Sequence, residues 1–154
     1  MTTIREVHAF LQQKAPFETA EDWDNAGLLA GNPDTAVSGI LLTLDITPQA
    51  VDFAADNGFA LIISHHPVIF HPLKKVESGS VVWELAQAGI SAICAHTNLD
   101  KARGGVNDCL AAALGLEHVT NYAVEGREKH YKLAVFVPVS HAEAVRHAMI
   151  WAGA

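Results

Sequence analysis

Two adjacent histidines, His65 and His66, directly follow an apolar run that reads as a buried strand. A second apolar run ends at Asp45, and a third is followed by residues 96–100, which begin with His96 and end with Asp100. Imidazole nitrogens and carboxylate oxygens together form a ligand set that suits Zn, Mn or Fe better than a thiolate-selected metal. These residue types therefore indicate a divalent-metal site, provided that the fold brings the three strand ends together.

The spacing of the two histidines constrains how they bind. Adjacent residues of a strand point to opposite faces, so neighbouring histidines do not easily chelate one ion. At a strand end they can reach two ions, or one ion and one substrate group, and Pro67 favours an extended backbone at His66. Asp100 supplies a carboxylate that can bridge two ions. We predict His65, His66 and Asp100 as metal ligands, against the alternative that each is a hydrogen-bonded polar residue.

The elements that must position these residues alternate along the chain. Apolar strands separated by helices predict an α/β fold, with a mainly parallel sheet covered by helices on both faces. Ligands of such sheets bind beyond the carboxyl ends of the strands. An N-terminal helix with a Thr3–Glu6 capping box precedes the sheet and ends at Pro16. The expected buried strands span residues 39–44, 59–63 and 90–95, and the expected helices span 48–57, 80–88 and 106–114.

The C-terminal residues follow a different pattern. Residues 131–137 read as a strand, and Ser140 with Glu143 reads as a second capping box before a helix. One strand and one helix are too little for a second domain. This piece is expected either to pack on the first sheet or to begin a larger unit.

Composition narrows the classes of function. The chain has 154 residues, 50% hydrophobic and 18% charged, which is enough apolar material for one folded domain. Its net charge of −7 and scattered basic residues argue against nucleic acid as a partner. A small anionic substrate remains compatible, because a metal supplies local positive charge.

The expected compartment is the cytoplasm. No apolar run is long enough for a membrane span, and the first residues lack the apolar core of a signal peptide. Cys94 and Cys109 form no disulfide framework and are expected to be buried free thiols in a reducing compartment.

Several residues keep two readings. Asp45 either joins the site or caps the helix that follows, and 24–25 either line a pocket or form a turn. Trp23 is expected in the core rather than as a stacking platform, together with Leu28 and Leu29. The pair 104–105 is expected to form a tight turn rather than a phosphate cradle. For His71 a place in the site and a place at the rim or in solvent stay equally open. The remaining histidines are expected at the surface: His8, His118, His130, His141 and His147.

Three segments, in their order and spacing, resemble the NIF-three-like family of dinuclear-metal-centre proteins, also described as GTP cyclohydrolase type-two homologues. They are residues 21–31, residues 64–74, and residues 95–100 followed by 104–108. The resemblance extends over essentially the whole chain. It implies an α/β fold that holds a pair of divalent metals.

The resemblance also implies roles for individual residues. His65 and His66 match the family's first two ligands, each serving a different ion; Asp100 matches its carboxylate ligand, and His96 matches a histidine that lines the site. Family members assemble as toroidal hexamers with their metal sites facing an internal cavity. The reaction attributed to them is hydrolytic opening of a purine nucleotide ring, and phosphoester hydrolysis is another suggestion.

The chain departs from the family pattern after Asp100. The family completes its site with a C-terminal His and a Glu four residues later, a spacing that His141, Glu143 and His147 do not have. Longer members carry an inserted domain between two halves of the core. We therefore expect residues 1–126 to be the metal-site core, and 127–154 to be the incomplete start of an inserted α+β domain.

The function expected from these observations is that of a metal-dependent hydrolase with two divalent ions. Two ions about 3.5–4 Å apart lower the pKa of a bridging water and polarise a substrate oxygen. His65, His66 and Asp100 hold the ions, while His96 orients the substrate or transfers a proton. The alternatives are a metal- or nucleotide-binding module without catalysis, and an inactive fragment that lacks the C-terminal ligands.

Overall fold

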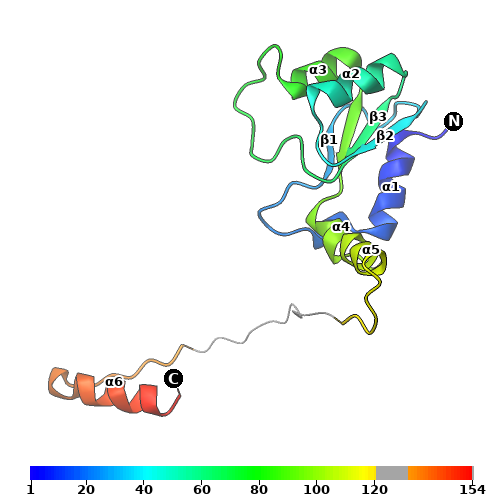
Figure 1. Ribbon diagram of the computed structural model, residues 1–154. Helices are drawn as coiled ribbons and strands as arrows, with labels where there is room; N and C mark the ends of the chain where they lie inside the picture. Colours follow the sequence, from blue (N-terminus) through cyan, green and yellow to red (C-terminus); the bar gives the residue numbers. More distant parts are fainter. Residues whose placement is uncertain (121–131, 154) are drawn as a thin grey trace. The chain divides into compact units, whose positions relative to one another are not determined.

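The computed structural model describes residues 1–120 and 132–153. The chain divides into two compact units, Met1–Val119 and Thr120–Ala154, and each is described by itself (Figure 1). The boundary expected between residues 126 and 127 lies outside the described residues and stays a prediction.

The first unit is built on one sheet of four strands. These are β1 (Gly27–Ala30), β2 (Ile40–Thr43), β3 (Leu61–Ser64) and β4 (Ser91–Cys94). Their order in the sheet is β1-β4-β3-β2; β2, β3 and β4 are parallel, and β1 runs antiparallel to β4. The predicted α/β fold with a mainly parallel sheet is confirmed.

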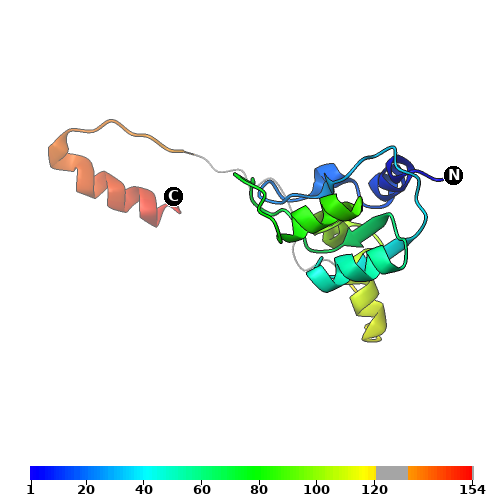
Figure 2. The same cartoon turned by 90° about the horizontal axis from the view of Figure 1, so that it is seen from above.

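Helices cover both faces of this sheet (Figures 1 and 2). On one face lie α2 (Pro48–Asp56) and α3 (Val81–Ala88), which enclose a cluster of buried aliphatic side chains with Ile62 at its centre. On the other face α1 (Ile4–Lys14) and η1 (Phe17–Thr19) pack over Leu61 and Ile93. Because strand side chains alternate, Ile62 and its neighbour Leu61 enter different clusters.

The predicted capping signals are present at the helices that flank the site. Thr3 and Glu6 form the capping box of α1, and the Thr47 hydroxyl caps α2 with Pro48 in its first turn. Gly89 ends α3 in the left-handed conformation, with φ of 66°. Local sequence therefore determines where these helices begin and end.

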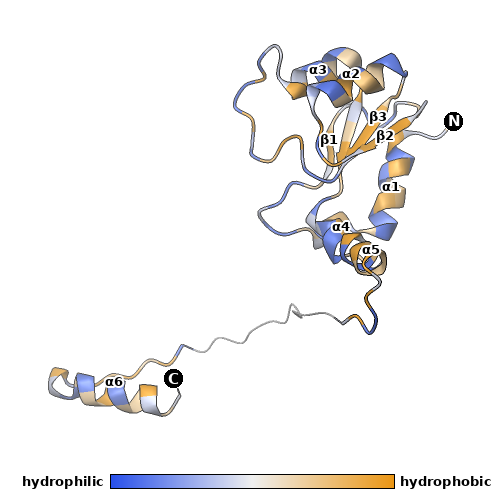
Figure 3. Cartoon of the chain, viewed as in Figure 1, coloured by the Kyte–Doolittle hydropathy of each residue, from blue (hydrophilic) through white to orange (hydrophobic). Residues whose placement is uncertain are grey.

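Strand β2 differs from its prediction as a buried strand. It is an edge strand; its residues Ile40 and Leu42 are 39% and 72% exposed, and Leu44, which follows the strand, is 58% exposed. The reason is that the cluster beneath α1 takes side chains from β1, β3 and β4 but none from β2. Orange, hydrophobic stretches occur on β2 as well as on the covered strands in Figure 3, so hydropathy alone does not distinguish the uncovered strand.

Two helices follow β4. The short α4 (Thr97–Lys101) was not predicted, and α5 (Val106–Ala113) agrees with its prediction within one residue. Gly105 joins them, and a Cβ atom at this position would lie 1.9 Å from the Leu99 carbonyl oxygen. Glycine is therefore required by close packing of backbone, and the pair 104–105 forms a tight turn, in which the Gly104 N–H donates to the Asp108 carboxylate.

The second unit corrects two predictions. Residues 132–138 form no strand, and no strand is present to pair with them among residues 132–153; residue 131 lies outside the described residues. A capping box at Ser140 is also absent, because Ser140 lies inside the 3-10 turn η2 (Val139–His141) that precedes α6 (Ala142–Trp151). Its hydroxyl contacts His141 Nδ1 instead, at 2.9 Å.

None of the helices in the described part of the chain has the length and apolarity that a membrane crossing requires.

The two cysteines occupy different environments, which corrects the prediction that both are buried. Cys94 is buried in β4, where burial and then the negative charge of Asp24 raise the pKa of its thiol to about 12. Cys109 is exposed on α5.

The different environments of the two cysteines give a prediction for their reactivity. We expect one thiol per native chain, that of Cys109, to react rapidly with Ellman's reagent, and the Cys94 thiol to react only after unfolding. The reason is that the thiolate is the nucleophile, and burial disfavours the thiolate of Cys94. Replacing Cys109 with Ser should abolish the rapid phase; two rapidly reacting thiols in the native chain would contradict this assignment.

The close approach at Gly105 gives a stability prediction. Gly105→Ala should lower the free energy of unfolding by about 3 kcal/mol, because the new methyl group must displace backbone. Gly79→Ala is the matched control: its φ is +83° but a Cβ atom there meets nothing within 4 Å. That control should cost only about 1 kcal/mol of left-handed strain. Urea unfolding followed by circular dichroism measures both, and equal losses would show that α4 and α5 are not packed as described.

Candidate metal centre

The three parallel strands end level with one another. Thr43 pairs with Ser64, and Ser64 pairs with Cys94, so the last residues of β2, β3 and β4 lie side by side. Backbone hydrogen bonds continue this alignment past the strands, from His65 N to the Thr43 oxygen at 3.2 Å and from Ala95 N to the Ser64 oxygen at 3.0 Å. The polar residues that follow these strands are therefore brought to one edge, as predicted.

Three histidines meet at this edge. One potential ligand atom from each of His65, His66 and His96 lies within 4.8 Å of the others. Their ring centroids are 5.1 Å apart for His65 and His96, 5.2 Å for His65 and His66, and 5.6 Å for His66 and His96. His65 and His66 converge because β3 ends at Ser64, so strict alternation of side chains no longer applies.

Each of the three rings is held through its Nδ1 atom. His65 Nδ1 lies 3.0 Å from the Ala95 carbonyl oxygen, and His66 Nδ1 lies 2.8 Å from Asp45 Oδ1. His96 Nδ1 lies 2.9 Å from Asp24 Oδ1. A carbonyl oxygen and an ionised carboxylate only accept hydrogen bonds, so each Nδ1 carries the proton and each neutral ring keeps its lone pair on Nε2. Metal-binding histidines are oriented in this way.

Asp24 is the most deeply anchored of these partners, because its side chain has no exposed area. The carboxylate accepts hydrogen bonds from the backbone N–H and hydroxyl of Thr97 at 3.1 and 2.5 Å, and from the Asn25 N–H at 2.7 Å. Burial by itself raises the pKa of Asp24, but the hydrogen bonds from Thr97, His96 and Asn25 outweigh it and hold the pKa below its usual value. Asp24 is therefore an ionised partner for His96.

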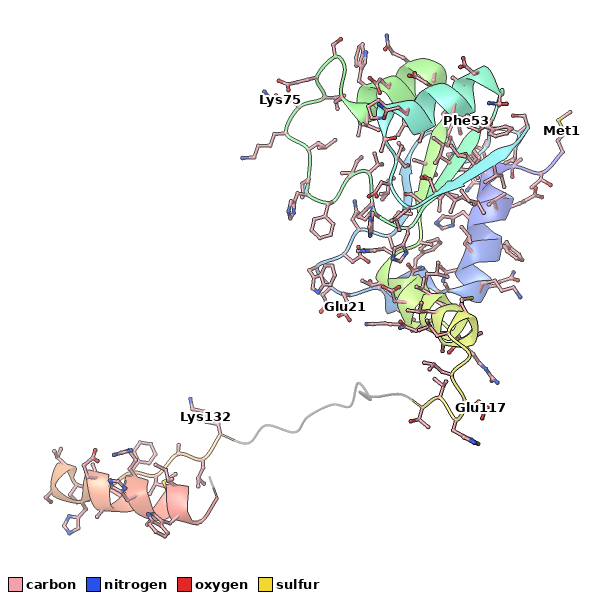
Figure 4. All side chains as sticks on the ribbon, in the orientation of Figure 1. Met1, Glu21, Phe53, Lys75, Glu117 and Lys132 are labelled. Atoms are coloured by element: carbon pink, nitrogen blue, oxygen red, sulfur yellow. The ribbon has the colours of Figure 1, made fainter. Side chains whose placement is uncertain are left out.

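Further contacts fix the segment that carries Asp24. The Glu21 N–H donates to Thr97 Oγ1 at 3.0 Å, and the Glu21 carboxylate pairs with Lys101 of α4 at 2.8 Å (Glu21 is labelled in Figure 4). Asn98 is fully buried; its side chain accepts from His96 N at 2.9 Å and donates to the Ala15 oxygen at 2.8 Å. The backbone of His96 is thereby tied to the end of α1.

Asp100 lies on α4, one helical turn beyond His96. Its Oδ1 is 3.7 Å from His65 Nε2, and its side chain is 36% exposed. The structure thus places the predicted ligands His65, His66 and Asp100 and the predicted catalytic residue His96 in one neighbourhood. Their roles as ligands and as catalytic residue stay predictions.

The donor set fits a divalent metal. Neutral imidazole nitrogens with a carboxylate oxygen nearby form an N/O site of the kind that Zn, Mn and Fe occupy. His65 and His96 are largely buried, with side chains 21% and 16% exposed, whereas the His66 side chain is 46% exposed. The centre therefore faces solvent on the side of His66, which leaves access for a small molecule.

The structure also decides between the alternatives that the sequence leaves open for Asp45, residues 24–25 and Trp23. Asp45 holds His66, while Thr47 caps α2. Asp24 contacts His96 and also closes a turn, in which its N–H donates to the Glu21 oxygen, whereas the Asn25 side chain donates to the Ile69 oxygen. Trp23, predicted in the core with Leu28 and Leu29, is 60% exposed, because the anchoring of Asp24 turns its neighbour outward; Leu28 does pack in the core.

The other histidines differ in exposure. His8 is half-buried and stacks on Phe17 at 4.5 Å, which corrects its prediction as a surface residue. His130 lies outside the described residues. His118, His141 and His147 are exposed, as predicted, and His71 is exposed, in agreement with the rim or solvent alternative.

Sequence reasoning missed the residues that orient the centre. The sequence allows Asp24 either in a pocket or in a turn, and it gives no specific sign that Thr97 and Asn98 are hydrogen-bond partners at the centre. The available signal was the density of hydrogen-bonding residues at 21–25 and 96–100. Pairing these two segments requires knowing that β1 lies antiparallel beside β4, with Gly27 opposite Cys94.

Comparisons with known proteins agree with this fold. The sequence model described as Duf34/NIF3 (NGG1p interacting factor 3) matches residues 2–150. A protein of Halalkalibacterium halodurans named GTP cyclohydrolase 1 type 2 homolog is 38% identical over 144 residues, which cover 91% of this chain and 39% of that protein. The chain spans about two fifths of the length of the curated relatives it matches.

Solved structures give the same result. A Bacillus cereus protein related to NIF3 superposes with a TM-score of 0.76 at 36% identity, over 97% of this chain and 42% of that one. Staphylococcus aureus protein SA1388 superposes with a TM-score of 0.73 at 40% identity, over 76% of this chain and 34% of that one. Since the family model spans nearly the whole sequence and these relatives share the fold, the chain belongs to the Duf34/NIF3 family.

Proposed function

We propose that this edge of the sheet is a divalent-metal centre of a hydrolase that acts on a small anionic substrate, a nucleotide or another phosphoester. The observation that carries the proposal is the shared anchoring of the three histidines through Nδ1, which leaves the Nε2 lone pairs available. The proposed ligands are His65, His66 and Asp100. The names of the curated relatives, GTP cyclohydrolase 1 type 2 homolog, support a nucleotide as substrate.

The proposed complement is two divalent ions, Zn, Mn or Fe, with His65 and His66 serving different ions. When bound, such ions supply a Lewis acid that polarises a carbonyl or phosphoryl oxygen. They also offset the surrounding carboxylates, so that an anionic substrate is attracted despite the net charge of −7.

His96 has the geometry of a positioning or proton-transferring group. Its Nδ1–H donates to the ionised Asp24, which stabilises the imidazolium form that results when Nε2 takes a proton. His96 then moves a proton at Nε2 or holds a substrate oxygen there. Asp24 acts through His96 and is a positioning residue.

The proposal extends to assembly and location. We propose that copies of this chain associate with one another and that the full-length protein forms a hexamer. We also propose that the protein is cytoplasmic. Apolar side chains exposed on β2 and α5 support association: Leu42 is 72% exposed and Leu110 is 56% exposed.

A binding module without catalysis is the second candidate. One observation favours it: the chain spans about two fifths of its curated relatives, so part of a complete ligand set can lie outside it. Each missing ligand weakens metal binding, because only water replaces it.

Metal content and turnover together test the proposal. Dialysed protein is loaded with Zn or Mn and analysed by elemental analysis, and hydrolysis of GTP and of a nitrophenyl phosphate ester is followed with and without chelator. We expect close to two ions per chain, and hydrolysis that chelator abolishes and metal restores. His65→Ala with His66→Ala should lose both, while His147→Ala on α6 should lose neither. Stoichiometric metal without hydrolysis would favour the binding module, and absence of metal would overturn the centre for this chain.

Asp24→Asn tests the anchoring of His96. An amide oxygen can accept only some of the hydrogen bonds that the Asp24 carboxylate accepts, so His96 loses its fixed orientation. The rate of metal-dependent hydrolysis should therefore fall about 10–100-fold, while the metal content stays unchanged. Asp22→Asn is the matched control, with the same change of charge on an exposed neighbour, and should change the rate less than about 2-fold. Initial rates of GTP hydrolysis by the metal-loaded protein measure both variants, and circular dichroism confirms their fold. An unchanged rate in folded Asp24→Asn would show that this contact does not position His96.

A further inference from the structure

An exposed aromatic pair lies beside the metal centre. The Trp23 side chain is 60% exposed and Phe70 is 40% exposed, and their ring centroids are 6.1 Å apart with planes tilted by 54°. Trp23 also meets the edge of the His96 ring, at 6.3 Å between centroids and 80° between planes. We name Trp23 and Phe70 the aromatic shelf.

The shelf is held in place by its backbone. Trp23 is preceded by residues bound to α4 through Glu21, and it is followed by Asp24, whose carboxylate is bound to Thr97 and His96. The loop that carries Phe70 is joined to the same segment, because Asn25 Nδ2 donates to the Ile69 oxygen at 2.6 Å. Two chain segments 40 or more residues apart therefore present their aromatic rings together.

Exposure of these rings is not explained by packing. Tryptophan buries a large apolar area in most folds, and a fixed, exposed one beside a polar site marks a binding surface. The side chains next to Trp23 in the sequence are the carboxylates Asp22 and Asp24, which disfavour an anionic group at this ring. Its chemistry suits an uncharged planar ring, which stacks on an aromatic face.

We propose that the aromatic shelf binds the planar ring of a nucleobase-type ligand, while the anionic part of the same molecule is directed to the metal centre. The binding of the anionic part of the ligand rests on the proposed function, whereas the binding of its ring to the aromatic shelf does not. The 6.3 Å between the Trp23 and His96 rings places a base stacked on Trp23 within reach of groups at His96. Trp23 is then a determinant of specificity for ring-bearing substrates over simple phosphoesters.

The test compares ligands that share one end. GMP carries a ring and a phosphate, ribose 5-phosphate carries the phosphate without the ring, and guanosine carries the ring without the phosphate. Affinities for the Mn-loaded chain are measured by calorimetry. We expect GMP to bind about 5–150-fold more tightly than ribose 5-phosphate, which is the range that the stacking of one base on an aromatic side chain contributes.

The variants assign this preference to Trp23. Trp23→Ala should remove the preference for GMP and leave ribose 5-phosphate binding and metal content unchanged, while Trp23→Phe should restore part of it. Trp151→Ala is the matched control, since Trp151 is 88% exposed on α6 and belongs to the second unit. Equal affinity for GMP and ribose 5-phosphate, or a preference that survives Trp23→Ala, would overturn the proposal.

Guanosine separates the shelf from the metal centre. In a chain with Trp83→Phe and Trp151→Phe, all tryptophan fluorescence comes from Trp23. Guanosine should quench it saturably with or without metal, whereas ribose should not. Quenching in a chain that fails to bind metal would keep the shelf and reject the metal centre. No saturable quenching by guanosine would reject the shelf, whatever the metal content.

Discussion

The hydrogen-bonded carboxylate of Asp24 is the interaction on which the centre depends. It joins the segment before β1 to the start of α4, two regions 73 residues apart in the chain, through Thr97 and His96. A buried carboxylate is stable only when its lone pairs are satisfied, and four donors meet this one. The same bonds orient His96, keep Asp24 ionised and turn Trp23 outward. The contacts that anchor Asp24 in the fold are thus the same contacts that orient His96 at the centre.

The sheet contributes the alignment that these contacts refine. Three parallel strands that end in register place His65, His66 and the start of α4 at one edge, and the polar groups there have partners in the backbone or in carboxylates. Two aliphatic clusters, one on each face, make this frame stiff. The histidines are consequently held before any ligand arrives, which lowers the entropy lost on binding.

Some apolar side chains of the first unit are not covered by any other element of that unit. Leu42 on β2, Leu44 just after this strand and Leu110 on α5 are uncovered within this unit, although their sequence pattern is that of buried positions. The strands that carry the histidines are packed on both faces, since the clusters beneath α1 and beside α2 and α3 enclose side chains of β3 and β4. The openness lies at the edge strand and at α5, away from the core that supports the histidines.

Sequence alone predicts the α/β fold, the parallel arrangement, the caps of α1 and α2, and the gathering of His65, His66, His96 and Asp100. These features follow from local signals: apolar runs, Thr3 and Thr47 as caps, and polar residues at strand ends. Three features emerge only from the folded chain: Asp24 orients His96, Trp23 is exposed, and β2 lies at an uncovered edge. Each of these depends on which distant segments lie side by side, namely β1 beside β4 and α1 over β3 and β4. Such pairings cannot be predicted from residue type and spacing, so two similar apolar runs can differ in that one is buried and the other is exposed.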